Sequence, residues 1–185
     1  MHETPHDIRI RPGGIADAPA VLDMLDSAVV WMNERGNTEQ WGTTPWSERP
    51  GRVERVERYT SEMTPYIAEL DGTPAGVLVL DSGPSSQMPI EPAGEPEQYV
   101  RLLVSHRRFA GLGIGAALLV HAAEEARRTG VDLLRVDCWA GGGGELVRFY
   151  ERNGFTPTDR FLHGTWPGQV LARRVGVRAA RSGTA

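Results

Sequence analysis

Lysine is absent from this chain of 185 residues, so all 20 of its basic residues are arginine and no lysine is available for modification. Cysteine occurs once, at Cys138, so an intrachain disulfide cannot form and a cytoplasmic location is expected. No apolar stretch approaches the roughly 18 to 20 residues that a membrane-spanning helix needs. The N-terminal sequence MHETPHDIRIRP also lacks the apolar core of a signal peptide.

A large net charge is also absent. The 20 arginines and 24 acidic residues give a net charge of −4, which does not favour bulk attraction to nucleic acid or to an anionic membrane. The length suits a single domain, which we expect at 8–175. A flexible N-terminus at 1–7 and a frayed tail at 176–185 would flank it.

Hydrophobic periodicity predicts a chain in which strands and helices alternate. Helices are expected from Asp17 to near Gly36, over 50–62, from a glycine-rich turn to Gly130, and from 145 to Gly154. Strands are expected at 8–11, 66–70, 76–80, 98–105, 131–138, 155–162 and 169–175. Asp71-Gly72 is typical of a hairpin turn, so 66–70 and 76–80 should pair.

The most informative segment is VSHRRFAGLGIGA, residues 104–116, which joins a strand to a helix through three alternating glycines. Glycine lets a ligand approach the backbone closely, and the first N–H groups of a helix can point at an anion. Such a turn is typical of a phosphate site. It is also compatible with glycines that only permit a tight turn, with a dinucleotide site, and with the pyrophosphate loop of an acyl-CoA enzyme.

The dinucleotide interpretation has some support, because Gly111, Gly113 and Ala116 fit G-x-G-x-x-A and Asp137 follows about 20 residues later. However, only about 70 residues follow Gly115, too few for several further strand–helix–strand units. Residues 106–110 also separate the strand from the first glycine, whereas the dinucleotide turn is tighter. Position therefore disfavours this interpretation.

Two motifs together, VSHRRFAGLGIGAALL and LVRFYERNGF, lie about 35 residues apart with a helix and a strand between them. In this order the chain resembles the GNAT superfamily of acetyl-CoA-dependent N-acyltransferases over roughly residues 8–175. The resemblance implies the α/β (α+β) GNAT fold, a mixed, mostly antiparallel twisted sheet of about six to seven strands flanked by about four helices. It also implies acetyl-CoA as cosubstrate, no metal, and a possible homodimer.

The resemblance also implies a set of cofactor-binding residues. The CoA pyrophosphate would bind the backbone N–H groups of Gly111, Leu112, Gly113, Ile114, Gly115 and Ala116. The pantetheine arm would pair with the strand edge at Leu103, Val104 and Ser105, where a backbone N–H would polarise the thioester carbonyl. Such a donor is worth about 2.7 to 4 kcal/mol in a transition state.

Tyr150 matches the family tyrosine that protonates the departing CoA thiolate. A thiol has a pKa near 8.5 and tyrosine one near 10, so a positioned phenol is a reasonable proton donor. A core aromatic beside Phe149 would show the same helical spacing, and the spacing alone does not separate these two roles.

Two positions depart from the family pattern. Ala110 stands where the family prefers Gln or Arg, and Arg107 and Arg108 are candidates to compensate for it. Gly143 stands where many members have an asparagine that contacts the cofactor arm. Because backbone amides carry most of the pyrophosphate binding, we expect at most a modest loss.

Attack on a thioester needs a neutral amine, yet an alkylammonium of pKa about 10.4 is largely protonated at pH 7. A proton acceptor is therefore useful. Glu97 is our first candidate for this catalytic base; Glu95, Asp137 and Glu69 are alternatives. A surface or strand-end carboxylate is the competing interpretation for each of them.

The acceptor itself is not identified by the sequence. Trp41 and Trp46, together with the acidic segment 90–98, could line a pocket for an organic cation. Alternatively, the tryptophans close the core and the acidic segment is solvated. The three internal histidines, His106, His121 and His163, show no metal-ligand spacing, and Cys138 is expected in the core.

These features predict an N-acetyltransferase in which a primary amine, most simply that of a small molecule, attacks acetyl-CoA directly in a ternary complex. The alternative is a non-catalytic module of the same fold that binds or senses acyl-CoA.

Overall fold

The computed structural model describes residues 7–177, so 1–6 and 178–185 of the two predicted terminal segments lie outside the described residues. Seven strands of this part form one sheet in the order β1-β2-β3-β4-β5-β7-β6. The strands are β1 (Ile8–Pro12), β2 (Thr64–Leu70), β3 (Thr73–Asp81), β4 (Glu97–Ser105), β5 (Leu133–Trp139), β6 (Thr156–His163) and β7 (Trp166–Arg174). Only β4 and β5 run parallel, so the sheet is mixed and mostly antiparallel, as predicted.

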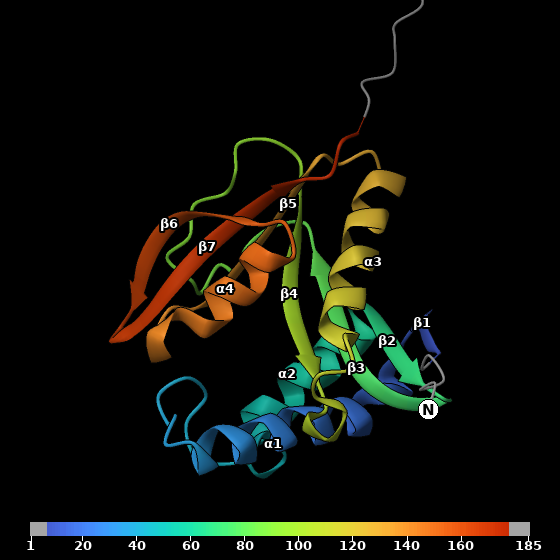
Figure 1. The fold of residues 1–185 in the computed structure, drawn as a ribbon, viewed down its shortest axis with the longest axis vertical. Coiled ribbons are helices and arrows are strands. Elements are labelled where there is room, and N and C mark those ends of the chain that lie inside the picture. The colour runs from blue at the N-terminus through green and yellow to red at the C-terminus, as the bar shows by residue number, and fades with distance from the viewer. Residues whose placement is uncertain (1–6, 178–185) are drawn as a thin grey trace, which may run out of the picture.

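Four α-helices cover the two faces of this sheet (Figure 1). They are α1 (Ala18–Glu34), α2 (Pro50–Ser61), α3 (Ile114–Arg128) and α4 (Glu145–Arg152). Buried residues of α1 and α2 pack with Ile67, Val79 and Leu102. Buried residues of α3 and α4 pack with Leu78 and Val136 on the opposite face. The sheet and its helices confirm the predicted fold class.

The strongest local prediction, the hairpin at Asp71-Gly72, is confirmed. Both turn residues have positive φ, 50° for Asp71 and 80° for Gly72. Leu70 pairs directly with Thr73 across the turn. Pairing therefore begins at the turn itself, which is why β3 starts at Thr73, before the residues that the hydrophobic alternation indicates.

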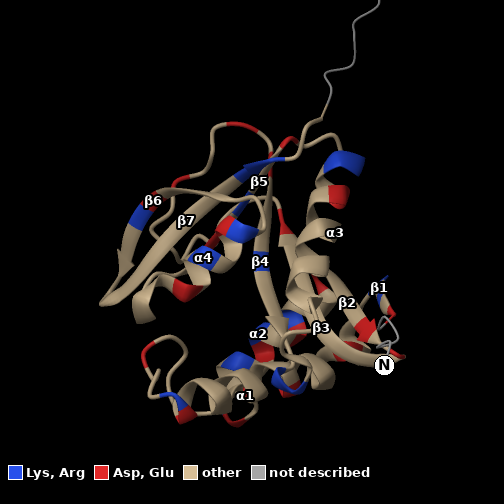
Figure 2. Cartoon of the chain, viewed as in Figure 1, with Lys and Arg blue, Asp and Glu red and all other residues tan. Residues whose placement is uncertain are grey.

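Basic and acidic residues are both scattered along the helices and strand ends of the ribbon in Figure 2. Within the described part, no helix is long and apolar enough to cross a membrane. The part of the fold that matters for a site is the middle of the sheet, where the parallel pair β4 and β5 lies.

Candidate active site

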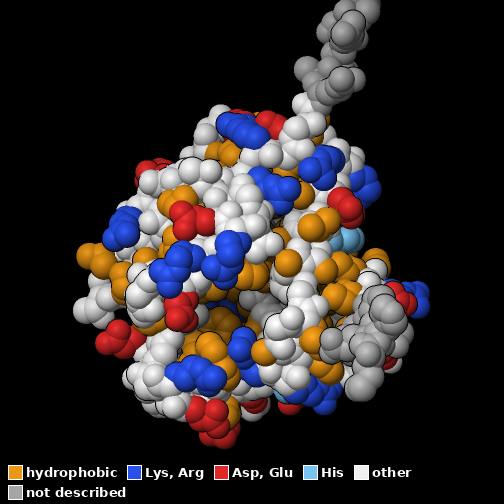
Figure 3. All heavy atoms as spheres, in the orientation of Figure 1, with side chains coloured by type: hydrophobic (Ala, Val, Ile, Leu, Met, Phe, Trp, Pro, Cys, Tyr) orange, Lys and Arg blue, Asp and Glu red, His pale blue; other side chains and the backbone are white. Residues whose placement is uncertain are grey.

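The two parallel strands separate halfway along their length. Residues Glu97–Val100 of β4 pair with Leu133–Val136 of β5, and the ladder ends there although both strands continue. Beyond Val100, the edge of β4 that faces β5 has no partner strand among the described residues. Figure 3 shows the surface hollowed between α4 and α1, with hydrophobic side chains lining the hollow. An extended ligand could therefore add to this strand edge.

The hydrogen-bond alternation of β4 fixes which backbone groups face this open edge. The N–H of His106 donates to the carbonyl of Ala75, near the beginning of β3, at 2.8 Å. In an antiparallel ladder, bonded and non-bonded positions alternate. The N–H of Val104 therefore points to β3, and those of Leu103 and Ser105 point to the open edge. The predicted pantetheine-binding segment lies at this edge.

The glycine-rich turn after β4 presents a row of free N–H groups at the start of α3. Gly111 and Gly113 have φ of 82° and 78°, a conformation that favours glycine. The N–H of Ala117 is the first to bond into the helix, to the carbonyl of Gly113. Within residues 7–177, no backbone or side-chain acceptor bonds the N–H groups of Gly111 or of residues 113–116. These groups, with the helix dipole, can bind an anion.

Gly115 brings this turn close to α4. A Cβ placed on Gly115 would lie 3.1 Å from Cζ of Phe149, so a larger residue would push the two helices apart. The ring centroids of Phe149 and the neighbouring Tyr150 are 5.2 Å apart. The predicted phosphate loop and the predicted acid are thus joined by direct packing.

Tyr150 is buried between Phe149 and Phe155, whose ring centroid lies 5.7 Å from that of Tyr150. No described residue forms a hydrogen bond with its hydroxyl. Burial, and secondarily the nearby Cys138 and Asp137, raises the pKa of Tyr150 well above its ordinary value. The phenol therefore stays protonated at neutral pH and has a proton to donate to a ligand.

Asp137 lies one residue beyond the last β4–β5 pair, where the strands separate. Leu134, Val136 and Cys138 belong to the core under α3 and α4, so Asp137 projects to the face of α1 and α2. Its Oδ1 accepts a hydrogen bond of 2.6 Å from the Tyr99 hydroxyl. Burial raises the pKa of this carboxyl, although the bond from Tyr99 opposes the shift.

Glu97 occupies a different environment. Both of its carboxylate oxygens accept bonds from Arg135, at 2.6 and 2.9 Å, and both side chains are buried. Glu97 begins β4, whereas the glycine-rich turn follows the other end of that strand. This bidentate pair occupies the lone pairs that a catalytic base would use. The geometry gives Glu97 a role in joining β4 to β5, and its assignment as base stays an untested prediction.

The two other candidate carboxylates also have arginine partners. Glu95 pairs with Arg174 at 2.7 Å on the surface, and Glu69 accepts a bond of 2.7 Å from Arg11 at the β1–β2 edge. Among the four carboxylates considered from the sequence, only Asp137 lies where β4 and β5 separate.

The arginines near the turn lie over aromatic rings. The guanidinium of Arg107 lies 3.8 Å from the Trp31 ring centroid, and Arg108 lies 4.6 Å from that of Phe109. Arg108 and Ala110 are exposed beside the turn. Gly143 is exposed with φ of 76°, and its carbonyl accepts a bond from Arg148. Arg108 thus lies exposed over Phe109 beside the turn, and Gly143 offers backbone only.

The aromatic and acidic groups considered for an acceptor pocket are engaged elsewhere. Trp46 is buried in the core, with Trp41 packed edge-on at 5.6 Å. Glu95 and Glu97 of the acidic segment are the carboxylates already paired with arginine. These contacts leave few groups to hold an organic cation.

Histidine and cysteine take structural positions. His106 accepts a bond from the N–H of Arg108 and lies 3.2 Å from Asp23, while His121 packs against Tyr66. His163 is exposed at the end of β6. Within 7–177 no group of three or more His, Cys, Asp or Glu could hold a metal ion. Cys138 is buried, and burial raises the pKa of its thiol to about 12.

Sequence reasoning missed Tyr99 as a partner of Asp137. Strand alternation places Tyr99 on the same face as Glu97, so its face was predictable. Its hydrogen-bond partner could not be predicted, because the pairing of β4 with β5 determines which residues meet across the sheet.

The site can be compared with known proteins. The acetyltransferase (GNAT) family model matches residues 28–155 of this chain. The PaiA N-acetyltransferase of Thermoplasma acidophilum, solved in complex with coenzyme A, has a TM-score of 0.65 at 18% identity, over 91% of this chain and 99% of that one. The yncA protein of Salmonella typhimurium, solved with acetyl-CoA, has a TM-score of 0.64 at 19% identity, over 96% and 99%.

A GNAT-family acetyltransferase of Listeria monocytogenes has a TM-score of 0.66 at 19% identity, over 90% of this chain and 94% of that one. No curated protein sequence matches the chain significantly. At these identities the structural matches establish the fold, while the family model covers well over half of the chain. The chain belongs to the acetyltransferase (GNAT) family.

Proposed function

We propose that this acyltransferase moves the acetyl group of acetyl-CoA to a primary amine, by direct attack in a ternary complex. The observation that carries the proposal is the row of unbonded N–H groups at Gly111 and residues 113–116, placed beside both an open strand edge and Tyr150. A phosphate anchor, an extended slot and a proton donor are the three features that acyl transfer from CoA requires.

Acetyl-CoA would bind with its pyrophosphate at the start of α3 and its pantetheine arm along β4. The N–H groups of Leu103 and Ser105 would pair with the arm and polarise the thioester carbonyl, as an oxyanion hole does. Two proteins of this fold, from Salmonella and Thermoplasma, were solved with acetyl-CoA and coenzyme A respectively. Arg108 is placed to add charge at the phosphates.

In the chemical step the amine nitrogen forms a bond to the thioester carbon, and the carbon–sulfur bond breaks. The sulfur takes the proton of Tyr150, and the amine gives up its own proton to a base. Burial raises the pKa of Tyr150, but it raises the pKa of a thiol held in the same apolar site as well. Burial in a shared apolar site therefore does not by itself widen the difference between the pKa values of the phenol and the thiol, and the phenol can donate as negative charge develops on the sulfur.

We assign the base to Asp137 in preference to Glu97. Its half-buried carboxylate has a raised pKa and lies where the strands separate, whereas Glu97 is held by Arg135. A raised pKa moves a carboxylate closer to the working pH, which improves it as a proton acceptor.

Calorimetry with acetyl-CoA and a thiol-release assay over a panel of amines test the proposal. We expect saturable binding of acetyl-CoA and amine-dependent release of CoA. An absence of binding at high micromolar acetyl-CoA would overturn the cosubstrate. Binding without thiol release from any amine would instead indicate a module that senses acyl-CoA. The cytoplasmic location, the small-molecule acceptor and the homodimer stay predictions.

A further inference from the structure

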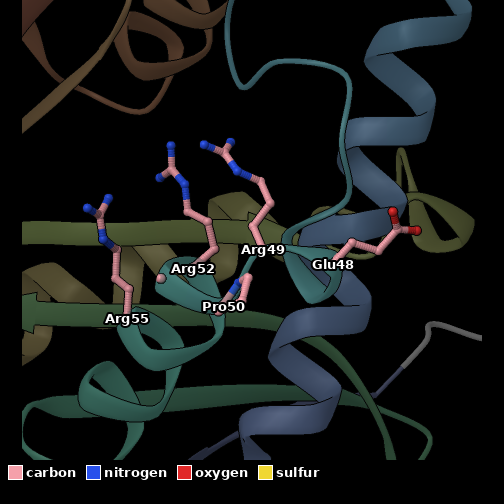
Figure 4. A pocket seen from close by; sticks show the side chains of 6 residues that line it. Glu48, Arg49, Pro50, Arg52 and Arg55 are labelled. Atoms are coloured by element: carbon pink, nitrogen blue, oxygen red, sulfur yellow. The ribbon is translucent and has the colours of Figure 1, made fainter.

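Three arginines at the start of α2 line an open depression of about 530 Å³ together with Glu48, Pro50 and Gly51. Figure 4 shows the side chains of Arg49, Arg52 and Arg55 extending side by side in one direction, while Glu48 points away from them. We refer to these three residues as the arginine cluster. The depression is open to solvent rather than an enclosed cavity, so a ligand there would be held by the arginine side chains themselves.

The arginine cluster has no counter-charge. Within residues 7–177, no carboxylate lies within ion-pair distance of any of the three guanidinium groups. By contrast, Arg11, Arg101, Arg135 and Arg174 each pair with a carboxylate. Three like charges kept together without a partner repel one another, and an anion would relieve that repulsion.

The positive charge comes from the side chains rather than from the helix terminus. The N–H groups of Arg52 and Val53 already bond to the carbonyl of Arg49, at 2.8 and 3.1 Å. Arg52 is also held in place, because its guanidinium lies 4.4 Å from the ring centroid of the buried Trp46. Burial and the charges of Arg55 and Arg49 lower the pKa of Arg52, which agrees with an uncompensated cluster.

The cluster lies on the same face of the sheet as Asp137. Helices α1 and α2 pack on the face to which Asp137 and Tyr99 project, opposite to α3 and α4. The loop between α1 and α2 is fastened to the other side of the hollow, since Nε1 of Trp166 in β7 donates to the carbonyl of Gln40 at 3.0 Å. An acceptor whose amine is deprotonated by Asp137 would lie on this face of the sheet.

We propose that the acceptor amine carries an anionic group, a carboxylate or a phosphorus oxyanion, which the arginine cluster binds. Guanidinium groups bind such anions through paired hydrogen bonds, and three of them can surround one tetrahedral or planar anion. This inference rests on the proposed acetyl transfer. It differs from the organic cation considered from the sequence, because Glu97 and Glu95 of the acidic segment are paired with arginine.

Matched pairs of amines test the inference through activity. Amino acids would be compared with the amines left by removing the carboxylate, and aminoalkylphosphonates with the corresponding aminoalkanes. We expect kcat/KM to be at least about tenfold higher for the anionic member of a pair, and Arg52→Gln with Arg55→Gln to remove that difference. Arg58→Gln, an exposed position of the same helix outside the depression, should preserve it.

A direct binding measurement keeps the test independent of finding the acceptor. Guanidinium N–H signals of the whole protein would be followed by NMR during titration with methylphosphonate and with acetate. We expect saturable shifts of the arginine cluster that the double variant abolishes and Arg58→Gln retains. An absence of saturation at tens of millimolar anion would overturn the anion site.

The outcomes separate this inference from the proposed function. If thiol release occurs but uncharged amines are preferred, or if the double variant slows both members of a pair equally, the inference fails and acetyl transfer stands. If the arginine variants weaken acetyl-CoA binding instead, the cluster binds the cosubstrate phosphates and the inference also fails. If acetyl-CoA does not bind at all, it is the proposed function that fails.

Discussion

The Tyr99 hydroxyl and Asp137 Oδ1 lie 2.6 Å apart and connect β4 to β5 at the point where the two strands separate. This bond holds a half-buried carboxylate beside the open strand edge. No arginine forms an ion pair with Asp137 among the described residues, in contrast to Glu97, Glu95 and Glu69.

Asp137→Asn should therefore lower kcat by about 10²- to 10⁴-fold, since the amide keeps the hydrogen-bond acceptor but cannot take a proton. Burial raises the pKa of Asp137, so its ionised form is lost at a higher pH than that of an exposed aspartate. In the parent protein kcat/KM should fall as the pH decreases through that raised pKa. A pH profile, restricted to conditions where circular dichroism is constant, measures this.

Glu97→Gln serves as the comparison for that profile. Because Glu97 is held by Arg135, its variant should keep the acidic limb of the profile, and Asp137→Asn should lose it. The reverse pattern would assign the base to Glu97 and remove Asp137 from the mechanism.

Tyr150→Phe should reduce kcat by about 10²-fold or more and leave the dissociation constant of acetyl-CoA unchanged. The hydroxyl has no hydrogen bond to a described residue, so its removal should not disturb the packing of Phe149 and Phe155. Steady-state kinetics and calorimetry measure the two quantities. As a control, Tyr59→Phe removes a hydroxyl from a half-buried tyrosine of α2. This variant should keep the parental kcat and the parental dissociation constant of acetyl-CoA. A Tyr150→Phe enzyme with parental kcat would rule out the proton-donor role.

Gly113→Ala should weaken acetyl-CoA binding by about tenfold, because alanine disfavours the φ of 78° that points the following N–H groups outward. Gly94→Ala is a matched control, since Gly94 has φ of 73° in a distant loop and also has open space at its Cβ position. Both variants should lose about 1 to 2 kcal/mol of stability in denaturant titrations. Equal affinities in calorimetry would argue against the pyrophosphate loop.

Local features of this fold could be predicted from the sequence because they depend on neighbouring residues. The Asp71-Gly72 hairpin, the helix that begins after Gly113 and the strands with apolar alternation are of this kind. The glycine-rich turn was predicted in the same way, and its N–H groups are unbonded at Gly111 and residues 113–116, whereas the N–H of Leu112 donates to the carbonyl of Phe109. The spacing of hydrophobic residues and the types of residue at the turns are sufficient to predict where these elements lie.

The polar partners in the site could not be predicted, because they depend on sheet order. Glu97 meets Arg135, and Tyr99 meets Asp137, each across 38 positions of sequence. Nothing in the local pattern around Glu97 distinguishes a carboxylate held by arginine from a free one. The burial of Trp46, which fixes Arg52, is likewise a product of packing between α1 and α2.

Glu97→Gln should cost about 3 to 5 kcal/mol of unfolding free energy, because it leaves the buried guanidinium of Arg135 without its charge partner. Glu95→Gln removes a carboxylate from a similar pair with Arg174, but both of those side chains are solvent-exposed. Water screens that pair, so its loss should not change the unfolding transition measurably. Chemical denaturation of the two variants side by side measures the contrast. Equal stabilities would show that the Glu97–Arg135 pair does not join the two strands, and the structural role assigned to Glu97 would then fail.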